Sequence, residues 1–190
     1  MDKFYNLKST DAAVSVTHTD PYAAALGPKN LIAGTTTFDL VFRTATTGDP
    51  DVSTGPWRIT ASTAGASSML AAVSPPIDVD PGAAVKLLVL AQGTLPDPGG
   101  SLGYRLSAAT QTAGQDFPVN VKVTDAFFNC KAVVATIGLS ADDPFDALEA
   151  VATITTVSGC KASFANAVLR TRNARGDGFE QPPGDEPVGR

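Results

Sequence analysis

Short runs in which apolar and polar residues alternate, each bounded by glycine or proline, recur along this chain. The clearest lies at residues 77–90, which read IDVDPGAAVKLLVL. A period of two places alternate side chains on one buried face of a β-sheet. The Asp-Pro-Gly step at residues 80–82 predicts a turn between two strands, since proline presets φ and glycine accepts positive φ. The expected buried set after the turn is Val85, Leu87 and Val89.

The same pattern predicts about nine strands in all. Besides residues 77–90, the expected strands lie at residues 13–19, 35–44, 57–62, 103–110, 119–124, 132–139, 150–157 and 163–171. Residues 64–73 leave strand and short helical turn both open. A short helix capped by Asp142 or Asp143 is expected to end near Glu149. Because no amphipathic run is long enough for a βαβ crossover, the chain is predicted to be all-β, an antiparallel β-sandwich.

The domain organisation follows from length and local composition. At 190 residues, the chain suits one large domain with appendages. We expect an N-terminal extension at residues 1–12 and a β-sandwich at residues 13–172, with a possible internal boundary near residues 111–117. Residues 173–190 are rich in glycine, proline and acidic side chains, which predicts a flexible tail.

The charge of the chain argues against several partners. The formal net charge is −5 and charged residues make up only 17% of the sequence. Binding nucleic acid requires clustered lysine and arginine, and the one basic cluster, at residues 170–175, is better explained as a solvated strand end or tail. No run approaches the length of a membrane span. We therefore expect neither nucleic acid nor membrane as a partner.

Four segments between residues 31 and 110 occur in a suggestive order. They are LIAGTTTFDLVF, the tryptophan strand GPWRITAS, the Pro-Gly turn and long apolar strand VDPGAAVKLLVLAQG, and GGSLGYRLSAAT. This order resembles that of bacterial immunoglobulin-like modules of the alpha-galactosidase-associated and CARDB type. The resemblance implies an immunoglobulin-like sandwich, here with an additional C-terminal hairpin. It also implies a spacer, adhesive unit or docking surface without catalytic residues.

The two cysteines, Cys130 and Cys160, are candidates for a disulfide. If residues 132–139 and 150–157 form an antiparallel hairpin that pairs Ile137 with Thr153, the same register places the two thiols opposite each other. Facing positions have Cβ atoms about 4.5–5.5 Å apart, which is near bonding range. The alternative is two free buried thiols. A bridge would indicate an oxidising compartment.

The remaining candidates for chemistry are weak. The single histidine, His18, lacks a recognisable nucleophile, and no catalytic motif is present. Acidic residues in two loops are candidate calcium ligands, although turn and capping roles explain them better. Aromatic side chains, Trp57 and Tyr104 among them, suit the core better than a sugar-stacking platform. Arg175, Gly176 and Asp177 form a possible adhesion tripeptide. The candidate calcium ligands named above are Asp49 and Asp51 in the first acidic loop, and Asp142, Asp143 and Asp146 in the second.

These observations favour a non-enzymatic structural or adhesive subunit of a surface-exposed assembly, such as a filament, fibre or layer. It is expected to bind a second copy or another surface protein, and to need no cofactor or metal. Residues 1–10 are candidates for adding a strand to a neighbour's sheet edge. The alternatives are a carbohydrate- or ligand-binding accessory module and a phage or virus capsid or tail accessory protein. The expected location is extracellular or at the cell surface, with the virion as the alternative. Residues 1–10 are polar and show no cleavable signal, so a cytoplasmic chain, a processed chain or a signal-less export route also fit.

Overall fold

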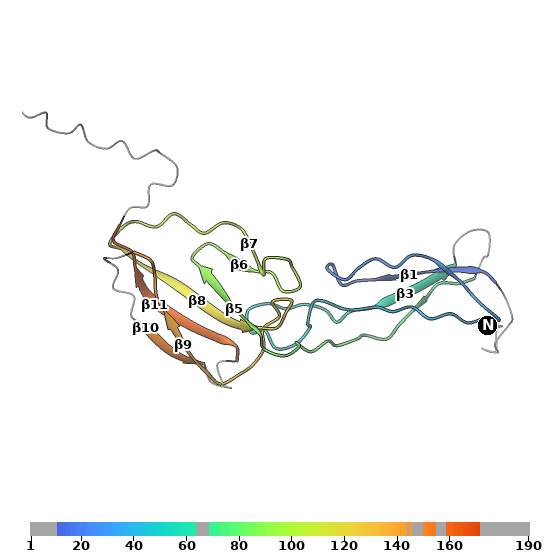
Figure 1. Cartoon of the computed structure of the whole chain (residues 1–190). Helices are drawn as coiled ribbons and strands as arrows, with labels where there is room; N and C mark the ends of the chain where they lie inside the picture. The colour runs from blue at the N-terminus through green and yellow to red at the C-terminus, as the bar shows by residue number, and fades with distance from the viewer. Residues whose placement is uncertain (1–10, 64–68, 144, 146–149, 155–158, 172–190) are drawn as a thin grey trace, which may run out of the picture.

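The computed structural model of the chain describes residues 11–63, 69–143, 145, 150–154 and 159–171. Within these residues all regular structure is β, with antiparallel pairing throughout and no helix. The predicted all-β class is therefore confirmed. Figure 1 shows an elongated molecule with two parts. We call the part built from strands β1–β4 the arm, and the part built from strands β5–β11 the head.

The arm is a narrow antiparallel sheet in the order β2-β1-β3-β4. Its two longer strands, β1 and β3, pair Val14 with Thr63 and His18 with Ile59. The end of the arm near Val14 and Thr63 is the tip, and the other end of β1 and β3, where His18 pairs with Ile59, is the end nearer the head (Figure 1). The four strands are β1 (Ala13–His18), β2 (Lys29–Asn30), β3 (Ile59–Thr63) and β4 (Ala72–Val73).

The head contains a three-stranded sheet in the order β11-β8-β5, a hairpin of β9 and β10, and a short pair of β6 and β7. The central strand β8 is the longest, at 9 residues. The seven strands are β5 (Lys86–Ala91), β6 (Leu95–Pro96), β7 (Tyr104–Arg105), β8 (Asp116–Thr124), β9 (Ala135–Leu139), β10 (Ala150–Ile154) and β11 (Lys161–Val168).

The apolar core lies on one face of the three-stranded sheet. Valine and phenylalanine occupy every second position of β8, so one face of that strand is continuously apolar. Ile137 of β9 packs onto this face, and Ala162, Phe164 and Ala167 of β11 extend it. The predicted alternation over residues 119–124 is confirmed. The β8 members of the core are Phe117, Val119, Val121 and Val123.

Residues 35–44 differ from the prediction. Their burial alternates as expected, because Phe38, Leu40 and Phe42 are partly buried and the residues between them are exposed. Residues 35–44 nevertheless belong to none of the strands. The alternation arises because the segment runs extended across the surface of the molecule. A sheet ladder also needs a partner strand at a fixed spacing, which alternation does not supply.

Residues 77–90 do not form the predicted hairpin. Ile77 pairs with Trp57 of the arm, and β5 pairs with β8 in the head, so the two halves of this stretch bind different partners. The backbone passes through residues 80–82 without a turn. The face after this point is also opposite to the prediction. The buried side chains are Leu88 and Leu90, whereas Val85, Leu87 and Val89 are exposed.

The hairpin of β9 and β10 exists, but its register is shifted by one residue from the prediction. Ile137 pairs with Ala152 instead of Thr153. A shift of one residue exchanges the two faces of a strand, so the alignment that was used to place the cysteines is wrong.

Strand β7 covers only residues 104–105 of the predicted strand at residues 103–110. Strands β5 and β8, on either side of residues 111–117, are neighbours in one sheet. The capped helix ending near Glu149, the extension at residues 1–10 and the tail at residues 173–190 lie outside the described residues.

Candidate functional site

Strand β5 forms one edge of the three-stranded sheet and carries a row of exposed apolar side chains. Its register with β8 places Leu87 opposite Val123 and Val89 opposite Val121, on the face that holds the core. The β9–β10 hairpin covers β8, whereas Val85, Leu87 and Val89 remain 63%, 57% and 54% exposed. We call these three residues the β5 stripe. Soluble proteins rarely leave such a row uncovered at a sheet edge.

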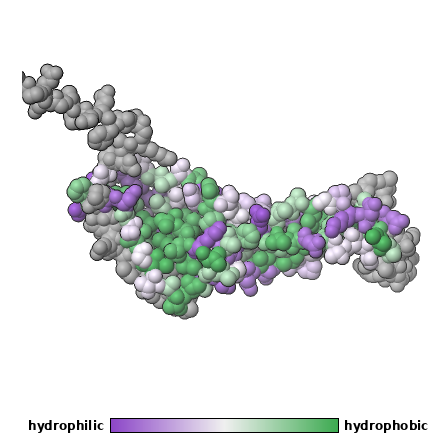
Figure 2. All heavy atoms as spheres, in the orientation of Figure 1, coloured by the Kyte–Doolittle hydropathy of each residue, from purple (hydrophilic) through white to green (hydrophobic). Residues whose placement is uncertain are grey.

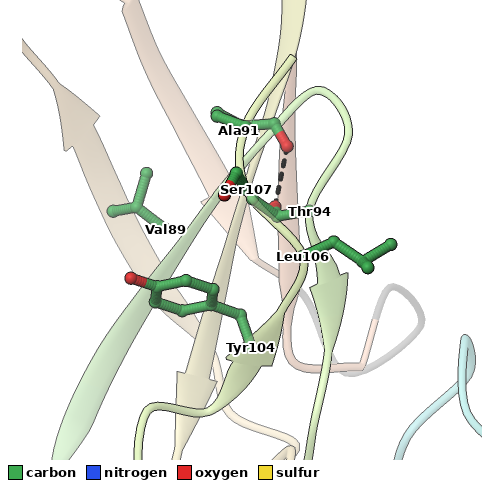
Figure 3. Close-up of a pocket in the computed structure, with 7 residues that line it drawn as sticks. Val89, Ala91, Thr94, Tyr104, Leu106 and Ser107 are labelled. Atoms are coloured by element: carbon green, nitrogen blue, oxygen red, sulfur yellow. Dashed lines mark hydrogen bonds between the residues drawn. The ribbon is translucent and has the colours of Figure 1, made fainter.

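A groove of about 450 Å³ runs beside this edge. One wall comes from Val89 and Ala91 of β5 and the other from Tyr104 of β7 and the segment that follows it, as Figure 3 shows. The Tyr104 ring projects from that second wall toward Val89, whereas the Leu106 side chain extends away from β5 (Figure 3). Leu106 has a φ of 68°, a backbone conformation that costs a non-glycine residue about 1–2 kcal/mol. The groove is therefore open, lined by both apolar and hydroxyl-bearing side chains, and bounded by a strained segment.

The tip of the arm also exposes large apolar side chains. Leu70, two residues before β4, is 97% exposed, and Ile32, two residues after β2, is 78% exposed. Met69 and Leu70 line a small hollow against Val14 and Ala61. Figure 2 shows green, hydrophobic side chains on the surface of both the head and the arm. The head and the tip of the arm thus each present exposed apolar side chains.

A buried carboxylate, Asp20, ties the chain that follows β1 to residues 43–44 at the end of the arm nearest the head. Asp20 is almost fully buried and accepts hydrogen bonds from the backbone N–H groups of Tyr22, Arg43 and Thr44 at 2.7–3.1 Å. The Thr44 hydroxyl donates a further bond at 2.8 Å. Burial alone would raise the pKa of Asp20, but these donors outweigh it and lower the pKa below its usual value.

Asn129 continues this junction into the head. Its side-chain oxygen accepts a hydrogen bond from the Ala45 N–H, and its amide group donates to the Arg43 carbonyl, both at 2.8 Å. The same amide group donates to Asp125, which also accepts a bond from the Gly82 N–H. Trp57 is buried beside them and donates from Nε1 to the Thr44 carbonyl at 2.7 Å. Five stretches of chain, at residues 20–22, 43–45, 57, 82 and 125–129, are hydrogen-bonded together at this junction, which connects the arm to the head.

The acidic pair Asp49 and Asp51 binds lysines. Lys122 of β8 is 1% exposed, and its Nζ lies 2.7 Å from Asp49 Oδ1 and 3.0 Å from Asp51 Oδ2. Asp51 also pairs with Lys161 at 2.8 Å. Burial would raise the pKa of Asp51, but the hydrogen bonds from Lys161 and Lys122 lower it overall. These two carboxylates therefore anchor their loop to the head, as expected from a structural role for them.

Asp143, the second acidic candidate, is also occupied by local donors. It accepts hydrogen bonds from the backbone N–H groups of Arg170 and Thr171 and from the Thr171 hydroxyl, at 2.6–2.7 Å. The Thr171 hydroxyl is the largest cause of a pKa well below the usual range for this carboxyl. Asp142 is exposed, and Asp146 lies outside the described residues.

Cys130 and Cys160 form a disulfide with Cα atoms 5.7 Å apart. The predicted bridge is present, but β8 brings the cysteines together instead of the hairpin. Val123 donates its N–H to the Cys160 carbonyl, and the next residue, Thr124, pairs with Cys130. After residues 125–129, the chain at Cys130 and Lys131 therefore runs beside the last residues of β8, on the side where β11 pairs with the earlier part of that strand.

The other predicted candidates are dispersed. His18 lies 3.0 Å from the Asp20 carbonyl oxygen and 3.1 Å from that of Ala24, with the Phe42 ring edge-on. Trp57 is buried as predicted, so its indole is not free to stack on a sugar, whereas Tyr104 is exposed, contrary to the prediction. The tripeptide of Arg175, Gly176 and Asp177 lies outside the described residues and stays a prediction.

Sequence reasoning missed the residues that define the junction and the groove. Asp20, Asn129 and Lys122 looked like ordinary turn or surface residues, because their partners lie 24–86 positions away. The exposure of the β5 stripe was missed because all of residues 87–90 are apolar, so the pattern did not distinguish the two faces.

Comparison with known proteins adds no relative: no family model, no curated protein and no solved structure matches the chain. Among the described residues, no helix is long and apolar enough to cross a membrane. The same residues contain no group of three or more histidine, cysteine, aspartate or glutamate side chains placed to hold a metal ion.

Proposed function

We propose that this protein is a non-enzymatic structural or adhesive subunit that builds a surface-exposed assembly through protein–protein contacts. The observation that carries the proposal is exposed apolar surface on both parts of an elongated molecule, the β5 stripe on the head and Leu70 at the tip of the arm. Burying this surface is favourable at about 25 cal/mol per Å² of apolar area. A monomer in water would leave both surfaces uncovered.

The position of the two surfaces supports an extended assembly. They differ in structure, one being a sheet edge and the other the end of a narrow arm. Contacts between unlike surfaces are heterologous, and repeated heterologous contacts produce rings or open fibres. The rigid junction around Asp20 and Asn129 favours such repetition, because it keeps the two ends in a constant orientation.

The proposed location is extracellular or at the cell surface. Support comes from the disulfide between Cys130 and Cys160, since such bonds persist in oxidising compartments. We also propose that the head is an immunoglobulin-like sandwich. Two features support an immunoglobulin-like sandwich: the strands are antiparallel, and the β9–β10 hairpin packs over the three-stranded sheet.

The test is the state of assembly of the purified full-length chain. Sedimentation velocity over a range of concentrations should show species larger than a monomer, and negative-stain images should show fibres, rings or layers. A protein that remains monomeric at its highest soluble concentration would refute the structural role. Titration of thiols in the denatured, unreduced protein tests the location, because two free thiols would remove the argument for an oxidising compartment.

A further inference from the structure

We propose that the open edge of β5 accepts residues 1–10 of a second copy of this chain as an added β-strand. This inference rests on the proposed structural role and identifies the contact that would carry it. The acceptor is the β5 stripe together with the groove beside it.

The acceptor has the features of a site for strand addition. Strand β5 is paired on one side only within the described residues, by β8, so its other side offers backbone N–H and C=O groups. An incoming strand gains affinity from these groups and specificity from the side chains on alternate positions. Leu87 and Val89 are two positions apart, and the core continues directly from them through Val121 and Val123.

The groove shows where the incoming strand would find its second wall. The Tyr104 ring faces Val89 of the β5 edge across it, so a strand placed along β5 would contact both walls (Figure 3). Val89 on one wall and the Tyr104 ring on the other favour an incoming strand with apolar side chains on the face that meets them.

Residues 1–10, MDKFYNLKST, match this requirement in sequence. Tyr5 and Leu7 are two positions apart and would share one face of a strand, as Leu87 and Val89 do. Phe4 would lie on the opposite face. The segment contains neither proline nor glycine, the two residues that most weaken a strand.

The geometry of the molecule requires the segment to come from another copy. Residue 11 lies at the tip of the arm, where Leu31 donates a hydrogen bond to the Ala12 carbonyl. From Ala72 near the tip to Val89 in the groove the chain runs without a turn, roughly 50 Å at the rise of an extended chain. Ten extended residues span at most about 36 Å. The segment therefore falls short of its own groove, and it would place the apolar tip beside the neighbouring head.

The test uses two full-length variants. The donor variant carries Tyr5→Asp and Leu7→Asp, and the acceptor variant carries Leu87→Asp and Val89→Asp. Each alone should be monomeric under conditions in which the unmodified chain assembles. A mixture of the two should give a one-to-one complex, since the intact segment of one fits the intact edge of the other. A synthetic peptide of residues 1–10 should dissociate the assembly of the unmodified chain.

Controls separate this contact from other effects. Val134→Asp alters another exposed apolar residue, 70% exposed, and should leave assembly unchanged. If the acceptor variant fails to fold by circular dichroism, Leu87→Thr with Val89→Thr removes the apolar stripe while retaining strand propensity. Assembly of either variant alone, or failure of the mixture to pair, would overturn the strand addition while leaving the structural role standing. An unmodified chain that is monomeric throughout would overturn both.

Discussion

Lys122 Nζ lies 2.7 Å from Asp49 Oδ1, although 73 positions separate the two residues in the sequence. The lysine belongs to the central strand of the head, and the aspartate to the loop that leads back toward the arm. Lys122 is buried on the face of β8 opposite the apolar core. The carboxylates of Asp49 and Asp51 balance the charges of Lys122 and Lys161, so this loop is held to the head by an ion-pair network.

Removal of one partner should be costly. We predict that Asp49→Ala lowers the free energy of unfolding by about 3 kcal/mol, because it leaves the buried ammonium of Lys122 with only the half-exposed Asp51. Asp49→Ala combined with Lys122→Met should recover part of that loss, since the double variant removes the unpaired charge. Urea denaturation measures both, and Asp78→Ala, at an exposed position, is the control. A change of less than about 0.5 kcal/mol for Asp49→Ala, within the range of ordinary surface substitutions, would contradict the role of the pair.

The buried carboxylate of the junction predicts a loss of stability in acid. The pKa values of Asp20 and Asp51 are lower in the folded protein than their usual value. Such groups stabilise the fold above the unfolded pKa of about 4, and this contribution is lost as the pH falls from there toward the folded pKa. Stability measured by thermal unfolding should therefore be constant from about pH 7 to pH 5 and fall steeply below pH 4.

A variant at Asp20 assigns that loss to a residue. Asp20→Asn should lower the free energy of unfolding by about 2 kcal/mol at pH 7, because an amide accepts the four hydrogen bonds less well than a carboxylate. The difference from the unmodified protein should shrink in acid, where Asp20 itself becomes protonated. Asp39→Asn, at an exposed position, provides the matched control. A pH-independent difference would show that the charge of Asp20 is unimportant.

The disulfide should contribute strongly to stability. It closes a loop of 30 residues and joins two segments that lie beside the end of β8. In the chain-entropy account, loss of such a crosslink costs about 3–4 kcal/mol. We predict that a reductant lowers the melting temperature of the unmodified protein, while the double variant Cys130→Ala and Cys160→Ala melts at a lower temperature that the reductant leaves unchanged. Equal melting temperatures for the oxidised and reduced protein would argue against the bond.

Local sequence pattern predicted the character of the strands well and their partners poorly. Alternation correctly placed Val119, Val121 and Val123 on one face, because a single buried face is a local property. It did not reveal that residues 35–44 lack a ladder, or that Ile77 pairs with Trp57, because pairing depends on distant chain segments.

The candidate site was predictable only in part for the same reason. The pairing of Cys130 with Cys160 is predicted correctly, although the predicted register of the β9–β10 hairpin is wrong. Both cysteines lie beside the end of β8, a strand outside that hairpin, so the hairpin pattern alone does not reveal why they meet. The β5 stripe was assigned to the core because valine and leucine at alternate positions normally indicate burial. At a sheet edge that no neighbouring element covers, the same residues are exposed, and no local signal in the sequence distinguishes the two cases.

A pair of glycines offers a test of the packing near the groove. Gly103 and Gly114 both adopt positive φ, at 76° and 80°. A Cβ at Gly103 would overlap the ring of Phe128, which also carries Lys86 over its face at 4.2 Å, whereas a Cβ at Gly114 would meet open space. Each alanine substitution pays the backbone cost of about 1 kcal/mol. Only Gly103→Ala should add a steric cost, of about 2 kcal/mol.

This comparison isolates the contact because the backbone strain is shared. Urea denaturation of Gly103→Ala and Gly114→Ala should therefore give free energies of unfolding that differ by about the steric cost alone. Gly103 directly precedes Tyr104, which lines the groove, so displacement of Phe128 should also weaken assembly if the groove is the acceptor. Equal stability of the two variants would mean that Phe128 is not packed against Gly103. The wall of the groove that begins at Tyr104 would then be less tightly packed than this contact indicates.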